Sequence, residues 1–183
     1  MPVTDLDAWS DRVRRSTEQV LERFEERYGY PPGVNEVVTG TRQGGSQMSL
    51  ELGHDAQVPP SIIEFFNAIE QVSLPDIWNG YFIGPATRIA AAHAEKYPRW
   101  LEHGGRLVEI LVIGSDGGGA LYVVGVDEDS PVFRIEEAAI ESGVLRPATE
   151  RQVERLAANF SAFLELFAGS LEFYASGGTT PSF

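Results

Sequence analysis

The chain has 183 residues, and its 14 Lys and Arg against 27 Asp and Glu give a formal net charge of −13 and a pI of about 4.6. This balance excludes nucleic acid binding through a basic face. The absence of cysteine excludes disulfides, thiolate metal sites and cysteine nucleophiles, and it favours a cytoplasmic location. The length and the ordinary globular composition predict one domain.

No apolar run is long enough for a signal peptide or a bilayer-spanning helix, so we expect a soluble protein with no membrane association. From Thr4 to Tyr28, apolar residues recur at steps of three and four, which predicts a helix that Gly29 ends. Residues 36–39 and 47–52 are predicted strands on either side of the turn-rich segment 40–46, and together they would form a hairpin.

A second helix is predicted over residues 60–72, because its apolar residues form one wide face and Pro75 follows it. Residues 79–84 then have the pattern of a turn and a short buried strand. The alanine-rich segment 85–100 is predicted to be helical as far as Pro98.

The strongest strand signals come next in the chain. Residues 107–113 and 120–126 are almost entirely aliphatic or aromatic, and the glycine-rich segment 114–119 joins them. A third strand is predicted over 132–135. Since short turns join antiparallel neighbours, these segments predict an α+β fold, a single domain with a central antiparallel sheet flanked by helices.

A last helix is predicted from the capping-box pair Thr149 and Gln152 onward, with a regular apolar face over residues 153–167 and an end at Gly169. We expect residues 176–183 to form a flexible tail. Residues 1–57 are then predicted to be an N-terminal helical extension, made of one helix and a short hairpin packed on the core.

The glycine-rich segment is predicted to be a structural turn, formed by Asp116, Gly117, Gly118 and Gly119. It has neither the Lys-Ser/Thr pair of a phosphate-binding loop nor the glycine spacing of a dinucleotide site, and a strand follows it. Glycine allows the positive φ that a chain reversal needs, and an Asp side chain can hydrogen-bond its own turn.

No catalytic motif emerges from the sequence. The three histidines, His54, His93 and His103, lack partners at metal-binding spacing, and the GxSxG pattern of a serine nucleophile is missing. We therefore expect no cofactor, no metal and no enzymatic activity, because site chemistry has to carry such a claim.

Two acidic groups and two aromatic residues remain as candidate partner-binding residues. The acidic groups are ordinary solvated charge in one interpretation and an anionic docking surface in the other; the aromatic residues are either core residues or interface anchors. The candidates are Asp127, Glu128, Asp129, Glu136, Glu137, Trp78 and Tyr81.

Five segments in sequence order resemble the SUKH superfamily, which contains fungal cell-wall-assembly regulators and bacterial immunity proteins. They are Val58-Pro59-Pro60 leading into Ile63-Glu64-Phe65-Phe66, Asn79-Gly80, Ile113 to Gly119, Pro131 to Ile135, and Phe160 to Leu164. The resemblance spans residues 58–167 and implies a SUKH-like α+β core over 58–175. Ala120 departs from it, because the family often has an acidic or amide residue there.

The resemblance implies a non-catalytic protein-binding domain, an intracellular immunity protein that neutralises a cognate toxin, often a nuclease. An acidic protein is suited to fill the basic cleft of such a toxin domain. Two alternatives stay open. One is a regulatory or scaffold protein related to the fungal members, and the other is a small-ligand binder or enzyme with a pocket near Asp116, His93 or His103.

Overall fold

The computed structural model describes residues 5–52, 58–94, 98–127 and 129–179. Its helices are α1 (Leu6–Leu21), α2 (Phe24–Tyr28), α3 (Gly44–Leu52), α4 (Pro60–Ala68), α5 (Ala86–Ala94) and α6 (Phe160–Ala175), with a 3₁₀ turn at Glu150–Gln152. Its strands are β1 (Glu36–Thr39), β2 (Ile69–Leu74), β3 (Tyr81–Ile83), β4 (Trp100–His103), β5 (Arg106–Asp116), β6 (Leu121–Gly125), β7 (Val132–Ile135), β8 (Ala138–Glu141), β9 (Val144–Pro147) and β10 (Val153–Ala157).

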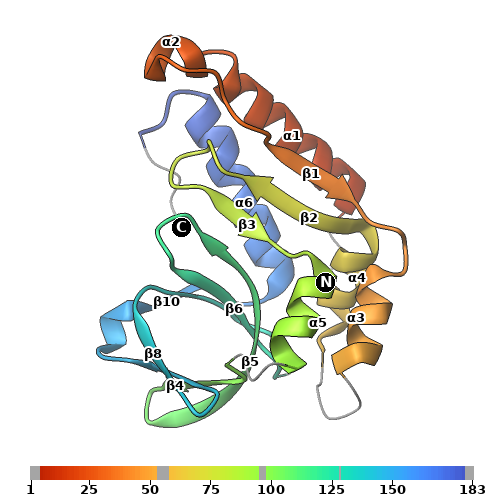
Figure 1. Cartoon of the computed structure of the whole chain (residues 1–183), viewed down its shortest axis with the longest axis vertical. Coiled ribbons are helices and arrows are strands. Elements are labelled where there is room, and N and C mark those ends of the chain that lie inside the picture. The colour runs from red at the N-terminus through yellow and green to blue at the C-terminus, as the bar shows by residue number, and fades with distance from the viewer. Residues whose placement is uncertain (1–4, 53–57, 95–97, 128, 180–183) are drawn as a thin grey trace.

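The ten strands of the described residues form one sheet. Seven of them follow one another in the order β1-β2-β3-β5-β4-β9-β8, and β6, β7 and β10 branch from this path. From this path β5 also pairs with β6, β6 with β7, and β7 with β10 (Figure 1). The pairings are antiparallel except for the parallel pair β4 and β9. The predicted α+β single domain is therefore confirmed, with a sheet that is mixed and not purely antiparallel.

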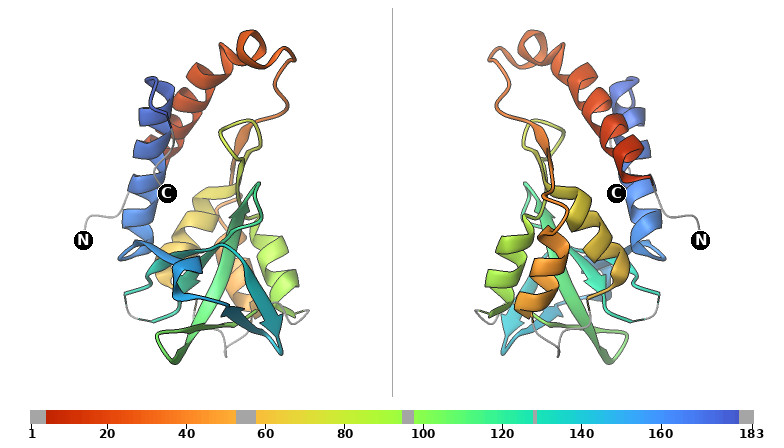
Figure 2. Two further views of the ribbon diagram at one scale, coloured as in Figure 1. Left: turned by 90° about the vertical axis from the view of Figure 1, so that its left-hand side faces the viewer. Right: turned by 90° about the vertical axis from the view of Figure 1, so that its right-hand side faces the viewer.

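The larger of two hydrophobic cores lies between the helices and strands β1 to β3, β5, β6 and β7. Figure 2 shows α1 and α6 side by side along one side of the molecule, with α5 on the opposite side of β5. The two helices are joined by Trp9, whose ring is buried against Phe65 and Phe167 and whose indole N–H donates to the Leu164 carbonyl at 2.7 Å. The N-terminal helix is thus part of the core.

The second core is smaller and lies between β5, β6 and β7 on one side and β4 and β9 on the other. It consists of Leu101, Ile110, Val123, Phe133, Ile135 and Leu145. Side chains alternate along a strand, so β6 and β7 supply both cores from their two faces. Figure 1 shows β4 and β8 at the end of the molecule away from α1 and α2.

The predicted hairpin of residues 36–39 and 47–52 is wrong in its second half. Strand β1 is present, but it pairs with β2 in the register Val37 to Val72, and residues 47–52 belong to helix α3. Gly45 brings α3 against the backbone of Ile63 so closely that a Cβ would collide with the Ile63 carbonyl oxygen. This packing against α4, which local sequence does not encode, accounts for a helix and not a strand at residues 47–52.

Other predicted boundaries shift because neighbouring strands impose their own pattern. The helix predicted over 60–72 ends at Ala68, and residues 69–74 continue as β2 between β1 and β3. The helix predicted from residue 85 is described up to Ala94, and Trp100 begins β4.

The predicted last helix is also displaced along the chain. Thr149 and Gln152 do form their capping contact, but it begins a 3₁₀ turn and strand β10. The helix starts after Asn159, whose side chain accepts from the Ala162 N–H, and it passes through Gly169 to Ala175. Strands β8 and β9 were not predicted. Of the predicted flexible tail, residues 180–183 lie outside the described residues.

Candidate functional site: an acidic pocket beside the glycine turn

Asp116 organises the turn that joins β5 to β6. Its Oδ1 accepts hydrogen bonds from the N–H groups of Gly118 and Ala120, both at 2.9 Å. Its own N–H donates to the Ala120 carbonyl, which closes the turn at the base of the hairpin. Gly119 has a φ of +92°, a conformation that L side chains rarely adopt. Local side-chain chemistry therefore fixes the shape of this turn.

The second carboxylate oxygen of Asp116 forms an ion pair with an arginine side chain. Its Oδ2 lies 2.9 Å from Arg134 Nη2, and Arg134 Nη1 lies 2.6 Å from Glu136. Arg134 projects from β7 and is mostly buried, whereas Glu136 is exposed beyond the end of that strand. The guanidinium is thus held between two carboxylates and presents little net positive charge to its surroundings.

Tyr81 lies close to this ion pair and is buried in the main core, at 2 % exposure. Burial raises the pKa of the Tyr81 hydroxyl, and the charge of Asp116 raises it further. Because so little of its surface is accessible, Tyr81 is a core residue, which is one of the two interpretations that the sequence left open, and it is not available as an interface anchor.

Arg134 and Glu136 of this network line a cavity of about 730 Å³, which we call the acidic pocket. It is lined by Gly118, Gly119, Ala120, Leu121, Arg134, Ile135, Glu136, Glu137, Ala138, Ile140 and Leu145. The aliphatic side chains give it an apolar wall, and the two glutamates give it an anionic rim. It lies between the glycine turn and the hairpin of β8 and β9, at one end of the second core.

The two predicted acidic groups do not form one surface. Glu136 and Glu137 line the acidic pocket. The pairs Leu121 with Ile135 and Val124 with Val132 show that β6 and β7 run antiparallel, so Asp127 and Asp129 lie beyond the opposite end of this hairpin. At about 3.3 Å per residue, the four-residue strand β7 that separates the two acidic groups is roughly 13 Å long. Glu128 lies outside the described residues.

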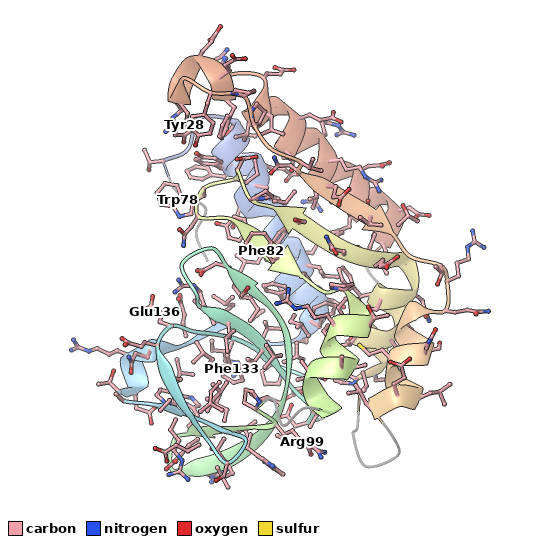
Figure 3. The ribbon with its side chains drawn as sticks, in the orientation of Figure 1. Tyr28, Trp78, Phe82, Arg99, Phe133 and Glu136 are labelled. Atoms are coloured by element: carbon pink, nitrogen blue, oxygen red, sulfur yellow. The ribbon has the colours of Figure 1, made fainter. Side chains whose placement is uncertain are left out.

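Trp78 lies on the other side of the glycine turn. It has a φ of +55° in the turn between β2 and β3, and its side chain is 51 % exposed. This turn packs on the glycine turn, since the Gly117 N–H donates to the Gly80 carbonyl at 3.1 Å. Figure 3 shows Trp78 and Glu136 along the same side of the molecule. A strained, exposed aromatic residue is typical of a binding surface.

An exposed aromatic group near Trp78 was missed at the sequence level. Tyr28 and Tyr30 are about half exposed, and both rings pack on Phe24. Tyr174 contacts the Trp78 ring at 6.2 Å between centroids. The helical period assigned Tyr28 to a buried face, but α1 ends at Leu21 and the short helix α2 carries Tyr28 to the tip of the molecule (Figure 3). The sequence Tyr30-Pro31-Pro32 after Gly29 was the signal from which these exposed aromatic residues could have been predicted, because it breaks the helix.

The histidines do not contribute to the acidic pocket as far as the structure describes them. Nδ1 of His103 lies 2.8 Å from a carboxylate oxygen of the exposed Glu150, and neither residue is among those lining the pocket. His54 lies outside the described residues, and His93 is described only as a position in α5.

The fold and the site together define an α+β domain with an anionic, partly apolar pocket at one end of its sheet. In comparisons with known proteins, the chain matches no family model, no curated protein and no solved structure. The resemblance of residues 58–167 to the SUKH superfamily therefore stays a prediction. Among the described residues, no helix has the length and apolar character needed to cross a membrane.

Proposed function

We propose that the protein is a non-catalytic, cytoplasmic protein-binding domain that neutralises a basic toxin, as an immunity protein does. The observation that carries this proposal is the acidic pocket, where an apolar wall meets the carboxylates of Glu136 and Glu137. The net charge of −13 and the resemblance to the SUKH superfamily support it further.

The charge of the rim favours a cationic partner. Asp116 and Glu136 already neutralise Arg134, whereas Glu137 is exposed and forms no ion pair with any described residue. Long-range attraction by such a protein accelerates the encounter with a basic surface. The aliphatic wall then contributes the contact area that electrostatic steering alone does not supply.

Co-purification with the toxin encoded beside the gene tests the proposal. We expect a complex whose affinity falls as salt is raised from about 50 to 300 mM, because screening weakens attraction between surface charges. No complex at 50 mM salt would contradict the proposed function.

A matched pair of charge reversals assigns the surface. Glu137→Arg and Asp129→Arg change the net charge equally, and both positions are exposed. We expect Glu137→Arg to weaken toxin binding at least tenfold and Asp129→Arg to have a much smaller effect. Equal losses would mean that total charge, not the acidic pocket, drives binding.

A small cationic ligand is the second candidate, because the volume of the pocket is in the range of small-molecule sites. A thermal-shift screen with arginine, lysine, agmatine and spermidine distinguishes the two. Saturable stabilisation by one of these amines, abolished by Glu137→Arg, would favour the ligand over the toxin.

A further inference from the structure

Strand β8 is an edge of the sheet and borders the acidic pocket. In the part of the chain that the structure describes, it pairs only with β9, in the register Ile140 to Leu145. Its residues are at least partly exposed along their whole length. An edge strand carries unpaired N–H and C=O groups, which are a template for an added strand.

The side chains of β8 connect this edge to the pocket. Ala138 and Ile140 both line it, as residues two apart on one face of a strand should. Ile140 is 54 % exposed, and its cross-strand partner Leu145 is buried at the base. A strand laid beside β8 would therefore direct alternate side chains into the pocket.

We propose that an extended basic segment of the partner adds to the sheet along β8 and places one Lys or Arg side chain in the acidic pocket. This inference rests on the proposed function and names the element of the toxin that is recognised. The aliphatic stem would pack on Ile140 and Leu121, and the charged group would reach Glu136 and Glu137 at the rim.

The charges around β8 select this occupant over a second copy of the chain. Glu137 precedes the strand and Glu141 ends it, and both are exposed; Glu141 lies 3.6 Å from Arg146 of β9, whereas Glu137 forms no ion pair with any described residue. Two copies paired along β8 would bring these carboxylates together, which is unfavourable between like charges on neighbouring strands. A basic strand instead meets the unpaired carboxylate of Glu137 beside the pocket.

The test uses a blocked pentapeptide, acetyl-Thr-Val-Arg-Val-Thr-amide, titrated into the whole protein and followed by amide NMR shifts. We expect saturable shifts confined to β8 and the glycine turn. Replacing Arg by the neutral citrulline should weaken binding at least tenfold. Shifts centred on residues 126–130, shifts spread over all acidic regions, or no saturable shift would each overturn the proposal.

Two N-methylated peptides test the strand pairing itself. Successive N–H groups of a strand point in opposite directions, so of the central Arg and the following Val, only one directs its N–H to β8. We expect N-methylation of one of them to weaken binding at least tenfold and that of the other to change it less than threefold. If the two N-methylated peptides bind equally, whether both weakly or both tightly, strand addition is overturned.

The peptide and the toxin experiments can fail separately. A toxin complex that Glu137→Arg disrupts, together with a peptide that does not bind, would overturn strand addition and leave the immunity function in place. Peptide binding without any toxin complex would contradict the immunity function and retain β8 as a peptide-binding edge.

Discussion

The carboxylate of Asp116 and the guanidinium of Arg134 form an ion pair of 2.9 Å that joins the end of β5 to β7 across the intervening strand β6. The side chains are 5 % and 19 % exposed, respectively. The same carboxylate caps the glycine turn, so one buried side chain holds both the turn and a wall of the acidic pocket.

Replacing Asp116 by alanine should therefore destabilise the fold strongly. The change leaves Arg134 with the exposed Glu136 as its remaining carboxylate partner and removes two hydrogen bonds from the turn. Breaking a buried ion pair from one side costs about 3 to 5 kcal/mol. Urea denaturation measures the loss, with the exposed Glu137→Ala as a control expected within about 0.5 kcal/mol of the unmodified protein. Similar values for the two variants would contradict the role of Asp116.

Two neighbouring glycines should respond differently to alanine. A Cβ at Gly117 would overlap the backbone oxygen of Asn79, whereas a Cβ at Gly119 meets nothing within 4 Å. At Gly119 only the positive φ is strained, which costs about 1 to 2 kcal/mol. We expect Gly117→Ala to lower the free energy of unfolding, measured by urea denaturation, at least as much as Gly119→Ala does. Unlike Gly119→Ala, it should also change the fluorescence of Trp78, because it displaces the turn that carries this residue. An unchanged spectrum for Gly117→Ala would show that the turns are not packed as described.

Stability should fall at alkaline pH because of two buried tyrosines. Burial raises the pKa of Tyr81 and of Tyr122 well above that of an exposed phenol. A raised folded-state pKa contributes stability that is fully present below the unfolded value near 10 and is lost as pH rises above it, since the unfolded state then binds fewer protons.

Urea midpoints between pH 8 and 11 measure this dependence, with tyrosinate absorbance recorded in parallel. We expect the free energy of unfolding to decline above about pH 10, and Tyr122→Phe to make the decline shallower. A flat profile in the unmodified protein would contradict the burial of these hydroxyls.

The N-terminal helix should be indispensable for stability. Trp9 is buried between α1 and α6, and its indole bonds to the Leu164 carbonyl. Truncating a buried aromatic residue costs about 3 to 5 kcal/mol, so Trp9→Ala should lower the thermal midpoint by many degrees. Leu50→Ala, at an exposed position, is the control. A small effect of Trp9→Ala would mean that α1 is only loosely attached.

Local sequence determined the central hairpin well. The aliphatic runs that became β5 and β6 are long, apolar on both faces and separated by glycines, so no helix competes with the strands. The role of Asp116 in hydrogen-bonding its own turn was accessible for the same reason, since the partners are two and four residues away.

The candidate site could not be predicted from the sequence, because it depends on contacts between segments that are far apart in the chain. Glu136 and Glu137 looked equivalent to Asp127 and Asp129 along the sequence, but the register of β6 and β7 separates the two groups. Part of the lining of the pocket comes from β8 and β9, whose four-residue strands carry too little pattern to be predicted.

The sequence by itself determined the fold class, the acidic character and the strands around the glycine turn, because composition, apolar runs and turn residues act over a few neighbouring positions. Only the tertiary structure decided that residues 47–52 are helical, that Tyr81 is buried while Trp78 is exposed, and that Glu137 borders an apolar pocket. The physical reason is that burial and strand register depend on packing between segments far apart in the chain, which local propensity does not encode.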